Sequence, residues 1–343
     1  MLPSAPIPSE AQPRMRRSLH LALFITSIVW AIAATALAAR AARGFSIRFQ
    51  LSDEFALIDA LFLVFLLVLG FGGLQSLIAR NTPLRETLGL PNRATAATEW
   101  ATGAAIGWGT VLLAVVPMAL SGSLHIRFWT EPRSFGLVLL NLATVLGASL
   151  AAELAFRGYP YRRLIQAIGP SWATVVMALL FAVLGGSSAG GGWRATGITL
   201  LFGLLLCVGW LRTHGIWLSW GLHFAWIASL GILFGFPVNG MDNLSTVVQT
   251  RAIGPSWLTG GDLGPEGALF TLLFLLAAMA VVIRVSREWA WHYTHKPIIP
   301  GGYPMDVAPP AAHTAMEQAA KPPTLVQIMP STPQARSVDN DPS

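Results

Sequence analysis

Long apolar stretches dominate the chain, and short segments between them hold most of the charged residues. A helix that crosses a bilayer needs about 20 mostly apolar residues. Eight stretches meet this requirement to within a few residues, at 19–39, 55–79, 99–121, 134–157, 171–186, 194–212, 216–236 and 266–285. The pattern predicts an all-α, polytopic membrane bundle of about eight transmembrane helices.

The two ends of the chain differ from the predicted bundle. They are rich in Pro, Ala and polar residues and show no helical periodicity, which is typical of disordered segments. We therefore expect disordered tails at 1–18 and 291–343 and one bundle over 19–290.

The first apolar stretch resembles a secretory signal. It follows Arg16 and Arg17 and ends in Ala36-Leu37-Ala38, which fits a cleavage site. However, the apolar region of a signal has about 7–15 residues, and this stretch is longer. We therefore expect an uncleaved membrane anchor.

The composition supports a membrane protein and narrows the set of partners. Only 11% of the residues are charged and 54% are hydrophobic, whereas a soluble domain has about 25% charged residues. The net charge is +6, but no run of Lys or Arg exceeds two residues, so membrane lipid is the expected partner and nucleic acid is not. Cys207 is the only cysteine, which excludes an intramolecular disulfide and a cysteine-rich metal site.

Basic residues indicate the orientation of the bundle. They are more frequent near the segment ends on the side that holds the N-terminus, although Arg40, Arg43 and Arg48 lie on the other side. Because cytoplasmic loops carry an excess of Lys and Arg, we expect both termini in the cytoplasm. We expect the membrane to be the bacterial inner (plasma) membrane.

Ionisable side chains inside a span are candidates for function, because they are costly to place in a bilayer. Glu153 and Arg157 are four residues apart, in reach of an ion pair on one helix face, and His223 lies in another apolar stretch. The alternative interpretations are structural: the pair neutralises itself at a helix end, and the histidine is a packing residue. Asp59 and Glu99 lie near predicted span ends, where we expect water to reach them.

Two other chemistries have weaker support. The segment 186–190 (GSSAG) fits the serine motif G-x-S-x-G with Ser188 as the nucleophile, but it lies in a Gly-rich loop and not in a strand-to-helix turn. A catalytic zinc usually takes three protein ligands. The sequence has no H-E-x-x-H motif, and Glu153 and His223 supply only two ligands. We therefore expect no metal site from the residues alone.

The order of several motifs resembles one family. The stretch 153–158 (ELAFRG) resembles the second half of an E-E-x-x-x-R motif, 181–185 (FAVLG) an F-x-x-x-H motif, and 222–227 (LHFAWI) an H-x-x-x-N motif. The stretches 234–240 and 257–267 are also similar to members of this family, the CAAX protease and bacteriocin-processing (CPBP) family of intramembrane proteases. The likeness covers about 55–285.

The resemblance implies an all-helical bundle of about eight spans with the active site inside it. Family members include endopeptidases that trim prenylated CAAX proteins and bacterial relatives tied to peptide processing or self-immunity. In the family pattern the first Glu and a His activate a water, while a second His and an Asn stabilise the oxyanion. The second Glu and the Arg organise the site. A divalent metal is implied by the resemblance only, and we expect no other cofactor.

The chain departs from this pattern at three positions. Ala152, Gly185 and Ile227 stand where the family has the first Glu, the first His and the Asn. A general base must lie within hydrogen-bond reach of its water, and an oxyanion donor is worth about 2.7–4 kcal/mol. Alanine and isoleucine supply neither. The site residues that match are Glu153, Arg157 and His223.

These substitutions predict a family member with impaired or absent peptidase activity that binds a membrane peptide or protein partner. Two alternatives remain open at this point. One is an active intramembrane endopeptidase that uses Glu153 and His223. The other is a small-molecule transporter, which needs a polar path across the bundle.

Overall fold

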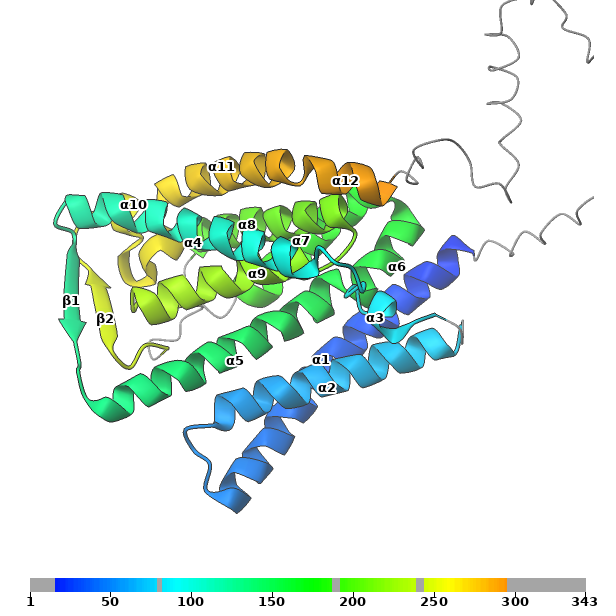
Figure 1. Ribbon diagram of the computed structural model, residues 1–343, viewed down its shortest axis with the longest axis horizontal. Helices are drawn as coiled ribbons and strands as arrows, with labels where there is room; N and C mark the ends of the chain where they lie inside the picture. The colour runs from blue at the N-terminus through cyan, green and yellow to red at the C-terminus, as the bar shows by residue number, and fades with distance from the viewer. Residues whose placement is uncertain (1–15, 79–81, 187–191, 239–243, 295–343) are drawn as a thin grey trace, which may run out of the picture. The chain divides into compact units, whose positions relative to one another are not determined.

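The computed structural model describes residues 16–78, 82–186, 192–238 and 244–294, which form a mostly helical bundle (Figure 1). Each of the eight predicted apolar stretches contains a helix. The α-helices are α1 (Arg17–Phe49), α2 (Phe55–Ser76), α3 (Leu84–Thr87), α4 (Ala96–Leu120), α5 (Pro132–Arg157), α6 (Tyr159–Ile168), α7 (Pro170–Gly186), α8 (Gly192–Thr213), α9 (Trp217–Ile227), α10 (Ser256–Thr259), α11 (Leu269–Val285) and α12 (Arg287–Thr294). A π-helical turn, η2 (Ala228–Leu233), continues α9, and a 3-10 segment, η3 (Gly261–Gly267), precedes α11.

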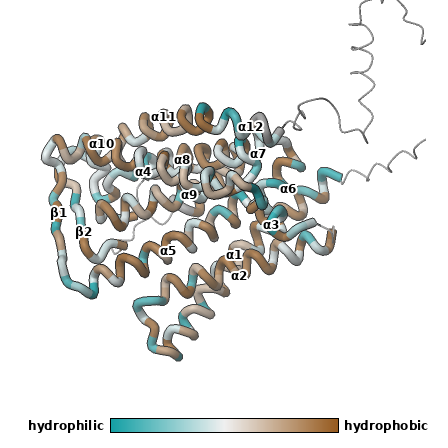
Figure 2. Tube along the Cα trace, viewed as in Figure 1, coloured by the Kyte–Doolittle hydropathy of each residue, from teal (hydrophilic) through white to brown (hydrophobic). Residues whose placement is uncertain are grey.

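Six of the described helical segments are long and apolar enough to cross a membrane. They contain α1, α2, α4, α5 with α6, α8, and η3 with α11. The apolar stretches around α7 and α9 are shorter. Large apolar side chains such as Leu139, which is 69% exposed, face outward, and Figure 2 shows hydrophobic residues along most of the helices. The chain is an integral membrane protein, because this surface suits lipid and not water.

A small β-sheet departs from the all-α prediction. Strands β1 (Leu124–Phe128) and β2 (Val248–Ala252) pair antiparallel, with Leu124 opposite Ala252 and Phe128 opposite Val248. Strand β1 (LHIRF) alternates apolar and polar residues, which is the period of a strand, whereas β2 (VQTRA) has three polar residues in a row. Each strand has only five residues, which is too short to be recognised in the sequence beside the long apolar stretches.

The chain bends sharply where α5 meets α6. The helix is interrupted at Gly158, and Pro160 lies in the first turn of α6, where proline is tolerated. A Cβ on Gly158 would lie 2.6 Å from the carbonyl oxygen of Leu154 and 3.0 Å from that of Leu88. Only glycine fits this close approach, so the bend holds the end of α5 against the segment after α3.

The helices extend slightly beyond the predicted bundle. Residues 17–18 and 291–294 are helical, and residues 1–15 and 295–343 lie outside the described residues. Ala38, at the proposed signal cleavage site, is buried within the continuous helix α1.

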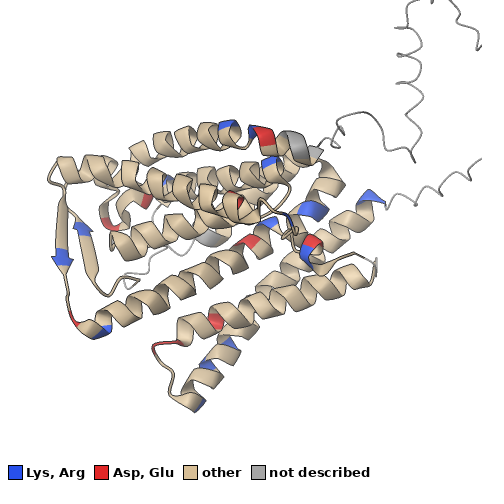
Figure 3. Ribbon diagram, in the orientation of Figure 1, with Lys and Arg blue, Asp and Glu red and all other residues tan. Residues whose placement is uncertain are grey.

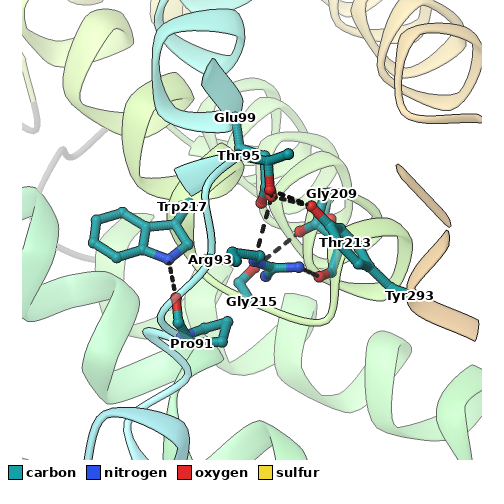
Figure 4. Close-up of polar contacts among 9 residues, drawn as sticks. All are labelled: Pro91, Arg93, Thr95, Glu99, Gly209, Thr213, Gly215, Trp217 and Tyr293. Carbon is teal, nitrogen blue, oxygen red and sulfur yellow. Dashed lines mark hydrogen bonds and ion pairs between the residues drawn. The ribbon is translucent and has the colours of Figure 1, made fainter. Parts of the chain in front are cut away.

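The position of Glu99 near a span end predicts contact with water, and this prediction is wrong. Glu99 is fully buried and lies in a polar cluster with Arg93, Thr95 and Tyr293 (Figure 4). Its Oε1 atom is 3.3 Å from Arg93 Nε and accepts a hydrogen bond from Thr95 Oγ1 at 2.8 Å. The Tyr293 hydroxyl donates to the same oxygen. Arg93 also donates to the carbonyl oxygen of Thr213 at 2.7 Å, so the cluster joins α4, α8 and α12.

Candidate functional site

The structure brings together the three site residues that the sequence predicts. His223 Nδ1, on α9, lies 2.8 Å from Glu153 Oε1, on α5. Arg157 Nη1 donates a hydrogen bond to the same oxygen at 3.1 Å. Glu153 and Arg157 are 0% exposed and His223 is 6% exposed. The three side chains therefore form one buried charged group that links two helices.

Arg157 is held on several sides. Its Nη2 atom lies 3.4 Å from the carbonyl oxygen of Gly203 on α8. Its guanidinium carbon lies 4.2 Å from the centre of the Phe181 ring on α7, which is a cation–π contact. These contacts of Arg157, together with its ion pair to Glu153, hold α5 in a fixed rotation against α7 and α8. This arrangement agrees with the structural interpretation of the pair.

The hydrogen bond to Glu153 determines how His223 presents its ring. A carboxylate paired with Arg157 is ionised and only accepts hydrogen bonds. We therefore assign a ring proton to Nδ1, and Nε2 is the ring nitrogen left for other contacts. The ring packs edge-to-face against Phe181 and Phe202, with centroids 5.8 Å and 5.5 Å away.

Close packing of α9 on α4 determines where His223 lies. A Cβ on Gly221 would lie 2.0 Å from the carbonyl oxygen of Trp100, and one on Gly103 would lie 2.0 Å from that of Leu218. The two backbones therefore touch directly, as small residues permit between membrane helices. This contact places α9 so that His223 faces Glu153 on α5.

A cavity of about 510 Å³ lies beside His223. Its lining comes from α2, α5, α7, α8, α9 and the segments around η2 and η3, and most of it is apolar, including Phe156, Phe181 and Phe202. Ala152 and Ile227, two of the three substituted positions, line the same cavity as His223. The third, Gly185, lies in α7 directly after Leu184, which also lines it.

Two acidic residues that the sequence does not mark as site residues line this cavity. Asp59, set aside as a residue near a span end, lines the cavity from α2, and its buried Oδ1 atom has no hydrogen-bond partner among the described residues. Glu266 lines it from η3 and accepts a hydrogen bond from Trp226 Nε1 at 3.3 Å. The cost of an ionisable group in a span is the signal that identifies Asp59. No local signal identifies Glu266.

The helix that carries His223 changes its geometry at the cavity. The α-helix α9 ends at Ile227 and continues as the π-helical turn η2. Single π-helical turns within helices are frequent at functional sites. Here the change begins directly after Ile227, a substituted family position that lines the cavity.

The residues of the site do not fit a divalent metal. Among the parts of the chain that the structure describes, no group of three or more His, Cys, Asp or Glu side chains could hold a metal ion. Glu153 and His223 are two donors that bond to each other, and the arginine beside Glu153 disfavours a cation there. A catalytic zinc usually has three protein ligands. Ser188, the residue of the serine motif, lies outside the described residues.

The fold and the site define a polytopic helical membrane protein with a buried Glu-Arg-His group beside an apolar cavity. Residues 134–229 match the family model "Type II CAAX prenyl endopeptidase Rce1-like". This stretch, which contains Glu153, Arg157 and His223, is therefore a domain of the Rce1-like CAAX prenyl endopeptidase (CPBP) family.

The match covers less than a third of the 343-residue chain and less than the predicted likeness over 55–285. The stretches 234–240 and 257–267 lie outside it, so their similarity to the family stays a prediction. No curated protein and no solved structure shows significant similarity to the chain.

Proposed function

We propose that this protein binds an apolar peptide segment of a membrane partner in the cavity beside His223, with impaired or absent peptidase activity. One observation carries the proposal: Ala152 and Ile227 line the cavity at the positions where the family has a Glu and an Asn. The cavity therefore has neither the general base nor the oxyanion donor expected at these positions.

Glu153 is poorly suited to replace the missing base. Neighbouring side chains on a helix point about 100° apart, so the carboxylate of Glu153 is directed away from the place that a Glu at position 152 would occupy. Its Oε1 atom already accepts hydrogen bonds from Arg157 and His223. This oxygen is therefore already engaged in two contacts and is not free to receive a proton from a water.

The composition of the cavity favours a peptide over a hydrocarbon ligand. The aromatic and aliphatic lining suits apolar side chains, while the carboxyl groups of Asp59 and Glu266 can accept hydrogen bonds. A peptide that is not helical inside a bilayer needs acceptors for its backbone N–H groups. A purely hydrocarbon ligand would supply no donors to these residues.

The first experiment measures cleavage. The full-length protein in detergent is incubated with fluorogenic peptides, prenylated and unprenylated, and we expect no cleavage above the background of the Glu153→Ala variant. The triple variant Ala152→Glu/Gly185→His/Ile227→Asn restores the family pattern and is expected to gain measurable cleavage. Cleavage by the wild type that stops in Glu153→Ala would contradict the proposal.

The second experiment measures binding. A membrane peptide with a photoreactive group is crosslinked to the wild type and to Ala152→Trp, which places an indole in the cavity. We expect crosslinking to fall at least about tenfold in this variant. The matched control is Leu139→Trp, on the outward face of the same helix, which is expected to crosslink like the wild type. Equal crosslinking in all three proteins would exclude the cavity as the binding site.

The contact between Glu153 and His223 favours a second candidate, an active endopeptidase with a rearranged site. The two side chains are hydrogen-bonded and His223 lines the cavity, so a small shift of either would admit a water between them. Asp59 and Glu266 are further carboxyl groups on the same cavity. The cleavage assay separates the candidates, because only this one requires activity that depends on both Glu153 and His223.

We also propose an orientation. The end of the bundle that holds the start of α1, α6 and α12 carries Arg16, Arg17, Arg162, Arg163 and Arg287, and Figure 3 shows basic residues mainly near helix ends. With α7 and α9 as the two remaining spans, eight helices place both termini on this side, the cytoplasmic side of a bacterial inner membrane. Accessibility of cysteines introduced at Ser18 and Ser134 to a membrane-impermeant reagent tests this orientation.

A further inference from the structure

A second site lies at the end of the bundle where α1 begins. There α6 packs beside α1 (Figure 1), and a polar pocket of about 150 Å³ is lined by residues that include Gln75, Thr87, Tyr159, Arg162, Arg163 and Gln166. This pocket shares no lining residue with the cavity beside His223. Its described lining contains two guanidinium groups and no acidic side chain.

Arg163 is a buried charge that has no ion-pair partner among the described residues. It is 7% exposed, and none of the ion pairs among the described residues involves it or Arg162. Its contacts are neutral: the amide oxygens of Gln75 and Gln166, the latter at 3.1 Å, and His20 Nδ1 at 3.4 Å. A buried charge is usually paired, so this guanidinium is suited to bind an anion.

Further donors face the same pocket. The hydroxyl group of Tyr159 is buried and has no hydrogen-bond partner among the described residues, and the Tyr159 ring lies 4.8 Å below the Arg163 guanidinium carbon. Arg162 donates one hydrogen bond to the backbone carbonyl of Glu86, which leaves other N–H groups of its guanidinium available. Arginine pairs with phosphate oxygens through parallel hydrogen bonds.

We propose that this pocket binds the phosphate group of an anionic phospholipid. A volume of about 150 Å³ accommodates a phosphate group but not a whole lipid, so the acyl chains must lie outside it. Leu77 and Leu84, close in sequence to Gln75 and Thr87, are exposed apolar residues that suit acyl chains. Basic pockets between membrane helices are known sites for anionic headgroups. The site is separate from the proposed peptide cavity and does not depend on it.

The test measures lipid binding to the full-length protein. The delipidated protein in neutral detergent is titrated with phosphatidylglycerol, with phosphatidylcholine or with inorganic phosphate, and bound lipid is counted by native mass spectrometry. We expect phosphatidylglycerol to bind at least about tenfold more tightly than phosphatidylcholine. Inorganic phosphate is expected not to displace it at millimolar concentration. Displacement at that concentration would show a free-phosphate site and overturn the assignment to lipid.

Variants locate the site. Arg163→Gln removes the buried charge and is expected to weaken phosphatidylglycerol binding at least about tenfold, because it removes a charge-assisted contact. Arg284→Gln is the matched control: it removes the same charge from an exposed residue outside the pocket, and we expect binding within about twofold of the wild type.

Tyr159→Phe tests the site if Arg163→Gln does not fold. It keeps the ring below Arg163 and removes only the unpartnered hydroxyl, so the fold is expected to be retained and binding to weaken about threefold or more. Equal binding of the two lipids, or wild-type affinity in Tyr159→Phe and in any folded Arg163→Gln protein, would overturn the proposal.

Discussion

Glu153 Oε1 lies 2.8 Å from His223 Nδ1, so one carboxylate oxygen links α5 to α9 across the interior of the bundle. The same oxygen accepts a hydrogen bond from Arg157, so the negative charge of Glu153 is paired with the positive charge of Arg157. The structural role of this group can be tested separately from any peptidase activity.

Removing the carboxylate is expected to destabilise the bundle. In Glu153→Ala the guanidinium of Arg157 would remain fully buried without a countercharge, which costs about 3–5 kcal/mol. Reversible unfolding in mixed micelles measures the change in the free energy of unfolding. The double variant Glu153→Met/Arg157→Met removes both charges at similar volume, and we expect it to recover most of the loss. A single variant as stable as the wild type would rule out a structural role for the pair.

The contact between α4 and α9 is expected to tolerate no side chain. In Gly221→Ala the new methyl group would meet the Trp100 carbonyl oxygen at 2.0 Å, so the helices must separate. Overpacking of this kind costs about 1–3 kcal/mol, and thermal unfolding in detergent measures it.

The control for this variant lies on α4. Gly109→Ala adds the same methyl group at a position with nothing within 4 Å, and it is expected to leave stability unchanged or to raise it by up to about 1 kcal/mol. Similar melting temperatures for the two variants would show that the backbones do not touch at Gly221.

The Tyr293 hydroxyl is expected to hold α12 against the bundle. Tyr293→Phe keeps the ring 4.1 Å from the Arg93 guanidinium carbon but removes the hydroxyl that contacts Glu99 and Thr95. The loss of a hydrogen bond to a charged group predicts a decrease of about 1.5–3 kcal/mol in the stability of this contact. Hydrogen exchange in α12 should increase while exchange in α5 stays unchanged. Unchanged exchange in both helices would contradict the contact.

The sequence predicts the helices well because the bilayer imposes their length and composition. Glu153 and Arg157 could be paired from sequence because their spacing places them on one helix face. The contact of His223 with Glu153 spans 70 residues, and only the family resemblance suggested it. The burial of Glu99 depends on Tyr293, 194 residues away. Asp59 and Glu266 line the same cavity only because tertiary packing brings their helical segments together, and no local sequence pattern predicts this.

The turn after α8 is expected to make stability depend on pH. Burial, together with the nearby Arg93 and Arg162, lowers the pKa of His214 below its usual value of about 6.5. The unfolded chain therefore binds a proton more readily than the folded protein, so stability is highest above pH 6.5 and falls as the pH decreases toward the lower folded pKa. The backbone of His214 has a φ of 50°, which asparagine tolerates, so His214→Asn removes the titration without straining the turn. Melting temperatures between pH 8 and pH 5 should fall further for the wild type than for this variant, and parallel curves would show that His214 does not contribute.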